Sequence, residues 1–432
     1  MYRMPQDTIE FMDKIGRIPR HLISDGYSEA MGMLLERARM ARLETVHYCF
    51  PTGYDCGTWI IPEKFTLRSA KLSSTDGNVL LDAEDNGLIC MSYSLPFFGK
   101  VTRNELFEHL HTHENLPDAV PFAYNYYNSD WGLCCSENFK KSLTDDEYIV
   151  EIDTAFSKGH MEVGEIIVPG QLDETFILAS HLCHPHQLND GPIGAIIGIE
   201  VLKKLREQGV KHTFRLLVMP ETIGSVAWIS KNKVLIPLIR GGLFCEMLTV
   251  DLPFRLNYSY MNNSLVDRLF EEIVKKEDKD NICERFNYGN DERQFNGPGV
   301  LVPMLALHRS NMSRFQEGRY DAYPEYHSEK DNIDLVTKEK VQRAYDLILA
   351  MLSKFDSYLV KPMANFKGEP CLSRFKLHLD NLTSFGEFMD IVNMCDRGMT
   401  IYEIGKYMEL DPGAVVKNLK PMEGAGLVRY EA

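Results

Sequence analysis

The sequence lacks several features that would assign it to a class of protein at once. None of its apolar runs approaches the roughly 20 residues of a membrane-spanning helix. The first residues, MYRMPQDTIEFMDKIG, are charged and amphipathic and lack the apolar stretch of a signal peptide. There is no internal repeat and no low-complexity segment. We therefore expect a cytoplasmic protein without a membrane partner.

Paired cysteines and an excess of basic residues are also missing. Ten cysteines are scattered over 432 residues, and none has the spacing of a structural zinc site. Several lie inside apolar runs, so we expect them to be reduced and mostly buried. The 47 Lys and Arg against 62 Asp and Glu give a net charge of −15. This balance argues against a nucleic-acid partner or an anionic membrane surface.

What is present predicts an α/β protein of several domains. Apolar strand candidates alternate with helix candidates over residues 143–365, which is typical of a mostly parallel sheet covered on both faces. We assign residues 1–54 to the same domain. Residues 55–142 form short β-rich pieces divided by turn signals, and predict an inserted β-rich domain. Over 366–432, three short helix candidates and a strand predict a winged helix. Its 8 Lys and Arg against 10 Asp and Glu favour a protein contact over DNA binding.

The most informative segment is 175–194, TFILASHLCHPHQLNDGPIG. Its apolar start predicts a buried parallel strand, and a helix begins near Pro192. His181 at the strand end and Asp190 before the helix would lie at the carboxyl edge of the sheet, where open α/β folds bind ligands. Glu221 and Glu246 follow later strand candidates, and His327 lies in a loop before the last long helix.

Together these five residues predict a metal centre. Neutral imidazole and carboxylate are zinc ligands, and a further carboxylate near metal-bound water acts as a general base. Taken singly, a histidine at a strand end is commonly a hydrogen-bonded surface residue, and a glutamate after a strand commonly sits at a helix N-terminus. Glu246 is different, since a carboxylate between LFC and ML needs a cation or a hydrogen-bond network.

The order of these residues resembles that of the co-catalytic zinc aminopeptidases. The chain is most similar to a bacterial aminopeptidase-like branch with an inserted β domain and a C-terminal winged helix, often associated with surface-polysaccharide biosynthesis. The segments that carry the resemblance are GTWIIPEKF, YNYYNSDWGLC, SHLCHP, NDERQFNGPG and PEYHSEKDNID. The resemblance spans nearly the whole chain and implies a three-layer α/β/α fold with a mixed, mostly parallel sheet.

It also implies roles. Asp190 would bridge two zinc ions, His181 and Glu246 would complete the first site, His327 would bind the second ion, and Glu221 would be the general base. Two departures leave the metal count open. Thr222 stands where the family has a second glutamate, and Cys183 stands where it has the aspartate that orients the histidine. The site could hold a single zinc ion or a loosely held second ion, and Cys183 or His184 could replace the missing ligand. His184, or less readily His186, could also be the ligand in place of His181.

Two further groups of residues allow both a structural and a functional interpretation. Asn290-Asp291-Glu292-Arg293 is either a solvated turn or a substrate site, in which Asp291 or Glu292 holds an ammonium and Arg293 a carboxylate or oxyanion. The alternating spacing of His109, His111 and His113 suits neither a helix face nor the site, so we expect surface residues.

Three functions compete. The first is a zinc hydrolase that cleaves a peptide or amide bond of a small substrate, with the insert and the winged helix narrowing access. The second is a non-catalytic binding or assembly protein with the aminopeptidase shell, supported by Thr222 and Cys183. The third, a transcriptional regulator, is disfavoured by the acidic C-terminal module. The substrate and the oligomeric state, a homo-oligomer included, stay open.

Overall fold

A computed structural model describes residues 5–113, 115–126, 128–285, 289–311, 322–377 and 384–431. Its centre is an eight-stranded mixed sheet. The strand order is β1 (Glu44–Pro51), β8 (His160–Val168), β10 (Thr213–Met219), β9 (Thr175–His181), β11 (Ile239–Cys245), β14 (Met304–His308), β12 (Arg255–Asn257) and β13 (Ile282–Glu284). The four central strands, β10, β9, β11 and β14, run parallel, while β8 and β12 pair antiparallel with them at either side. The predicted mixed, mostly parallel sheet is confirmed.

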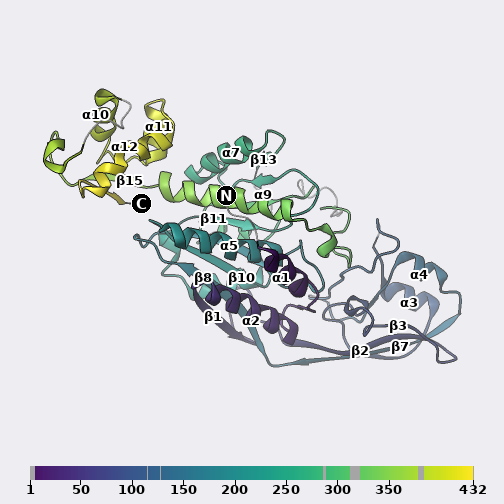
Figure 1. Ribbon diagram of the computed structural model, residues 1–432. Coiled ribbons are helices and arrows are strands. Elements are labelled where there is room, and N and C mark those ends of the chain that lie inside the picture. Colours follow the sequence, from purple (N-terminus) through teal and green to yellow (C-terminus); the bar gives the residue numbers. More distant parts are fainter. Residues whose placement is uncertain are drawn as a thin grey trace.

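Helices cover both faces of this sheet, and Figure 1 shows those of one face. One face carries α1 (Gln6–Gly16), α2 (Asp25–Met40), α5 (Pro192–Gln208), α7 (Leu265–Glu277) and α9 (Lys338–Tyr358). The ring of Phe176 in β9 packs against Phe270 of α7 and Phe355 of α9 on that side. On the opposite face lie α6 (Ile223–Lys231) and the single turn α8 (Glu292–Phe295), where Trp228 contacts Phe295. The result is the three-layer α/β/α arrangement that the resemblance implied.

The start of α5 lies unusually close to the sheet, and this fixes the position of Asp190. A Cβ added to Gly194 would lie 2.1 Å from the carbonyl oxygen of Cys245 at the end of β11, so only glycine fits there. The turn before the helix has φ +123° at Gly191, which other residues rarely adopt. The segment from Asp190 to α5 is therefore held directly beside the end of β11.

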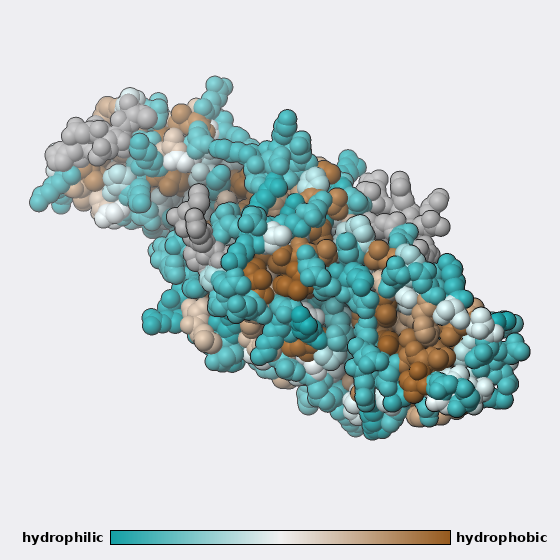
Figure 2. All heavy atoms as spheres, turned by 45° about the vertical axis from the view of Figure 1, so that its right-hand side comes forward, coloured by the Kyte–Doolittle hydropathy of each residue, from teal (hydrophilic) through white to brown (hydrophobic). Residues whose placement is uncertain are grey.

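The insert lies between β1 and β8 at one end of the molecule. Its antiparallel sheet has the order β3 (Val79–Asp82), β2 (Lys64–Ser74), β7 (Glu147–Ser157) and β4 (Phe97–Thr102). It also contains α3 (Arg103–His109), α4 (Glu137–Ser142) and the short strands β5 (Leu110–His111) and β6 (Leu133–Cys134). The predicted boundary at residue 142 falls short, because β7 pairs with both β2 and β4. Figure 2 shows apolar side chains gathered on this end, where Val79, Phe98 and Tyr124 are exposed.

The C-terminal module lies at the opposite end of the molecule from the insert (Figure 1). Strands β15 (Lys361–Ala364) and β16 (Val428–Glu431) pair antiparallel, and between them come α10 (Phe385–Asn393), α11 (Ile401–Tyr407) and α12 (Pro412–Gly424). Lys211, just before β10, lies over the ring of Tyr430. The module therefore packs at the amino edge of the parallel strands. The expectation that it narrows access to the carboxyl edge is wrong, and its assignment as a winged helix stays a prediction.

Two compositional expectations are met in the described residues. All ten cysteines are free, and seven of them are buried. Among the helices of the described ranges, none is both long and apolar enough to cross a bilayer.

The histidines at 109, 111 and 113 are half-buried and are not the surface residues that had been expected. His109 stacks on Trp131, and His113 Nε2 bonds the carbonyl oxygen of Tyr326.

Candidate metal centre

The five predicted side chains come from the carboxyl ends of adjacent parallel strands and the loops beyond them. His181 is the last residue of β9, Glu221 lies in the turn after β10, and Glu246 follows β11. All seven residues of β9 are buried, so the strand runs through the core and delivers His181 to the sheet edge without solvent contact. Asp190 precedes α5, and His327 comes from the loop before α9.

His181, Asp190 and Glu246 form the buried half of the centre. His181 Nε2 lies 3.0 Å from Glu246 Oε2 and 3.2 Å from Asp190 Oδ1. The side chains of these three residues are at most 4% exposed. One candidate ligand atom from each lies within 4.8 Å of the other two. The residues predicted to hold the first metal ion are thus in mutual contact, away from bulk water.

The second oxygen of Asp190 faces a different set of side chains. His327 Nε2 lies 3.0 Å and His184 Nε2 3.9 Å from Asp190 Oδ2. His184 Nε2 is also 3.7 Å from Glu221 Oε2. The side chains of His327 and Glu221 are 24% and 32% exposed, so the centre opens to solvent on their side. Asp190 therefore stands between an inner and an outer group of candidate ligands.

The donor set fits a divalent cation. Although Asp190 Oδ2 and His327 Nε2 are 3.0 Å apart, their geometry is not that of a hydrogen bond, and neither atom has a hydrogen-bond partner among the described residues. Buried polar atoms without partners are rare and costly, and a shared ion would satisfy both atoms. Imidazole nitrogens and carboxylate oxygens without a paired lysine or arginine are typical of zinc sites.

Burial and mutual repulsion perturb the acids of the centre. Burial, together with the smaller effect of the nearby Asp190 and Glu221 carboxylates, raises the pKa of Glu246 to about 8. Burial also raises the pKa of Glu221 above its ordinary value. Burial would raise the pKa of Asp190 too, but the imidazoles of His184, His181 and His327 hold it well below the usual range. A cation would relieve the crowding of these negative charges.

The backbone around Asp190 is held by a carboxylate that the sequence reading did not single out. Asp331 accepts hydrogen bonds from the backbone N–H of Asn189 and of Asp190, both at 2.9 Å. It also accepts one from the side-chain amide of Asn189, at 3.1 Å, and one from the Tyr323 hydroxyl, at 2.9 Å. Asp331 lies within PEYHSEKDNID, the segment that carries His327. It therefore ties the two loops that supply the metal-facing residues.

A second supporting residue, Arg20, gave no signal in the sequence. Its fully buried guanidinium donates to the carbonyl oxygens of Leu182, His184 and Gln187, at 2.9, 2.7 and 2.6 Å. Burial lowers the pKa of Arg20 to about 10, which leaves the group charged at neutral pH. These hydrogen bonds hold the loop between β9 and α5 around the guanidinium of Arg20.

In the segment Asn290 to Arg293 the first three residues are buried beside the centre and Arg293 is half-buried, so the segment is not a solvated turn. Asn290 Nδ2 donates to Glu246 Oε2 at 2.9 Å. Asp291 Oδ1 accepts from the backbone N–H of Thr222 at 2.8 Å, and Glu292 Oε1 accepts from that of Asn290 at 2.9 Å. Arg293 Nη2 donates to the Thr222 hydroxyl at 2.7 Å. Asp291 and Glu292 are at most 1% exposed. A substrate-binding role for Asp291, Glu292 and Arg293 stays a prediction.

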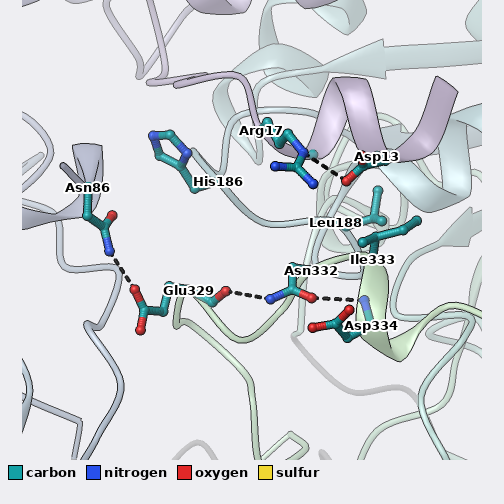
Figure 3. A pocket seen from close by; sticks show the side chains of 10 residues that line it. Asp13, Arg17, Asn86, His186, Leu188, Glu329, Asn332, Ile333 and Asp334 are labelled. Atoms are coloured by element: carbon teal, nitrogen blue, oxygen red, sulfur yellow. Dashed lines mark hydrogen bonds and ion pairs between the residues drawn. The ribbon is translucent and has the colours of Figure 1, made fainter. Parts of the chain in front are cut away.

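His186 faces away from the centre. It lines a pocket of about 260 Å³ between α1, Asn86 of the insert and the loop 329–334 (Figure 3). In this pocket Asn86 Nδ2 donates to Glu329 Oε2 at 2.5 Å. Burial lowers the pKa of His186 to about 4. It has the position of a structural histidine at the junction of insert and core.

The insert also reaches the centre itself. The Phe122 ring packs edge-on against the rings of His184 and His327, with centroids 5.0 and 5.3 Å away. Its backbone N–H donates to the carbonyl oxygen of His327 at 2.7 Å. His327 has φ +52°, a conformation that costs free energy outside glycine and is common at functional sites. The insert therefore helps to hold one of the outer ligands.

Comparison with known proteins assigns the chain to a family. A family model described as "Domain of unknown function (DUF4910)" matches residues 9–357. The chain belongs to this family. A protein of Clostridium acetobutylicum described as a "putative polysaccharide biosynthesis protein with aminopeptidase-like domain" is 28% identical over 317 residues, 73% of this chain and 71% of that protein.

Solved structures of the same fold include peptidases. A crystal structure described as a "putative peptidase" from Clostridium acetobutylicum superposes with a TM-score of 0.80 at 22% identity, over 98% of this chain and 96% of that one. The zinc aminopeptidase BSAP of Bacillus subtilis gives a TM-score of 0.59 at 13% identity, over 82% of this chain and 96% of that one. The resemblance to aminopeptidase-like proteins is confirmed, and the protein has the aminopeptidase fold.

Proposed function

We propose that this protein is a zinc-dependent hydrolase that cleaves a peptide or amide bond in a small substrate. The observation that carries the proposal is the convergence of His181, Asp190, Glu246 and His327 with an adjacent, partly exposed Glu221. His181, Asp190 and Glu246 would hold the first zinc ion. His327 would bind a metal on the other oxygen of Asp190. Bound zinc supplies Lewis-acid polarisation of the scissile carbonyl and lowers the pKa of water.

In this proposal Glu221 is the general base. Its carboxylate takes a proton from the attacking water as the new C–O bond forms, and then returns this proton to the leaving amine as the C–N bond breaks. Its side chain is the most solvent-exposed carboxylate of the centre, and its raised pKa makes it a stronger base than an ordinary glutamate. The Glu246 carboxylate accepts a hydrogen bond from Asn290, and the two oxygens of Asp190 face His181 and His327, so both carboxylates are taken up as ligands in this proposal.

The insert favours a small substrate. Phe122 covers part of the outer side of the centre, over His184 and His327, while the side of Glu221 stays open to solvent. The ring leaves less room for a bulky substrate there. The description of the Clostridium acetobutylicum relative extends the proposal to amides on sugar or modified amino-acid intermediates of polysaccharide biosynthesis. Aminoacyl amides and N-acylated amino sugars are therefore the first substrates to screen.

The test is Glu221→Gln in the zinc-loaded protein. We expect turnover to fall by about 10²- to 10⁴-fold, the contribution of a general base, while zinc content stays that of the parent. Glu329→Gln is the matched control, because this carboxylate lies two residues beyond His327 and bonds Asn86. It should retain parental activity. Unchanged turnover in Glu221→Gln would show that the base is another group.

The second candidate is a catalytically silent binding or assembly protein. Thr222 and Cys183 favour it, because a carboxylate ligand and an orienting carboxylate of the active family are absent at these positions. Metal analysis after mild dialysis separates the two candidates. The hydrolase retains one to two zinc ions per chain, whereas a stably folded protein that takes up no zinc would leave only the second candidate.

A further inference from the structure

A metal on the outer side of Asp190 needs more ligands than the resemblance provides. On that side the aminopeptidase pattern would use a glutamate at position 222, and this chain has Thr222. The Thr222 hydroxyl accepts a hydrogen bond from Arg293, and its backbone N–H is bonded to Asp291. Both polar groups of Thr222 are thus engaged with the segment beside the centre. Position 222 does not supply a replacement for the missing carboxylate.

His184 lies where that ligand is missing. Its Nε2 is 3.9 Å from Asp190 Oδ2 and 3.7 Å from Glu221 Oε2, between the bridging carboxylate and the general base. Candidate ligand atoms of His184, Asp190 and His327 all lie within 4.8 Å of one another. This is the spacing of groups around a single ion, since two ligands at about 2.1 Å from zinc are 3 to 4 Å apart.

The orientation of the His184 ring is fixed by its surroundings. Its Nδ1 lies 3.7 Å from Cys183 Sγ, and the Phe122 ring packs against its edge. Its backbone carbonyl accepts from Arg20 at 2.7 Å. With Nδ1 turned to the cysteine, Nε2 is the nitrogen presented to Asp190. A ligand histidine held through its other nitrogen and its backbone is pre-organised for metal binding.

We propose that His184, Asp190 and His327 form a second zinc site in which a histidine replaces the glutamate of the related aminopeptidases. The proposal rests on the hydrolase proposed above, since it adds a second ion to the same centre. It also gives Cys183 a role, because its sulfur lies beside His184 and also accepts the backbone N–H of Glu221 at 3.1 Å. Two imidazoles and one carboxylate are a common zinc donor set, with a further position left for water or substrate.

The test is the zinc stoichiometry of the full chain, measured by elemental analysis and by titration of metal-free protein against a competing chelator. We expect two zinc ions for the parent and one for His184→Ala. His184→Asn, which keeps a polar group near Cys183 but is too short to reach the ion, should also bind one. Zinc-edge anomalous diffraction should place the second ion of the parent about 2.1 Å from His184 Nε2.

His186→Ala is the matched control, because this histidine lies two residues further along the same loop and lines the pocket of Figure 3. It should bind two ions. Two ions in a folded His184→Ala variant would overturn the inference, and loss of the second ion in Cys183→Ser instead would assign the ligand to the sulfur. If the parent protein binds one zinc ion and has normal turnover, the second site is wrong but the proposed hydrolase stands. If the parent protein binds no zinc, both proposals fail.

Discussion

Asp331 offers a sharp test of how the centre is held together. In the structure it only accepts: two N–H groups of Asn189 point to Oδ1, and the Asp190 N–H and the Tyr323 hydroxyl point to Oδ2. Asp331→Asn keeps the size and shape of the side chain but replaces one oxygen with a donor. Whichever oxygen is replaced, two donors then face an NH₂ group.

The cost follows from these contacts. Hydrogen bonds to a charged group contribute about 1.5–3 kcal/mol each, so the loss of two such bonds predicts a destabilisation of about 3–6 kcal/mol. Asp331 is fully buried, and solvent does not replace the lost partners. Part of the loss should appear as weaker zinc binding, because the proposed ligands Asp190 and His327 lie on the two loops that Asp331 joins.

The assay has two parts. Urea unfolding of metal-free Asp331→Asn, followed by tryptophan fluorescence, should give a lower midpoint with little change in slope. Chelator competition should give a higher zinc dissociation constant. Asp334→Asn is the control, since its carboxylate lies on the same loop and in the pocket of Figure 3, away from the centre. A destabilisation below about 1 kcal/mol with parental zinc affinity would refute the reasoning.

Two other predictions follow from groups around the centre. Arg20→Met removes the donor of five buried carbonyl oxygens, those of Ile15, Ile18, Leu182, His184 and Gln187. The unfolding free energy should therefore fall by at least about 3 kcal/mol in the same urea assay, and a change below about 1 kcal/mol would contradict the role given to Arg20. Burial raises the pKa of Glu246 from 4.5 to about 8, so the metal-free site holds a proton between these pH values that zinc must displace. Zinc affinity should therefore weaken about tenfold per pH unit below pH 8 for each proton displaced, measured by chelator competition, and a pH-independent affinity would count against this account.

The strand ends of the central sheet can be predicted from the sequence alone. Parallel strands buried on both faces appear as continuous apolar runs, and their polar ends meet at one edge. The positions of His181, Glu221 and Glu246 at these strand ends therefore predict that the three residues lie together. His327 follows no strand directly and lies in a long loop, so its residue type made it a candidate and the resemblance assigned it to the second ion.

Other features depended on contacts that the sequence does not encode locally. Arg20 lies in an ordinary N-terminal segment, and only the folded chain brings the carbonyl oxygens of residues 182–187 around it. The short helix α8 buries Asp291 and Glu292, although their composition is that of an exposed turn. The end of the insert was misplaced for a different reason. In β7 the buried residues Tyr148, Val150 and Ile152 alternate with more exposed ones, which is a half-buried antiparallel pattern, but the strand was counted with the central sheet.

The two loops joined by Asp331 lie far apart in the chain, and this orders the assembly of the protein. Residues 181–190 are made early, and every one of their bonds to Asp331 waits for a segment about 140 residues further on. A nascent chain that ends before residue 327 contains all eight strands of the central sheet but lacks both His327 and Asp331. The proposed metal centre can therefore close only when the α/β domain is almost fully synthesised.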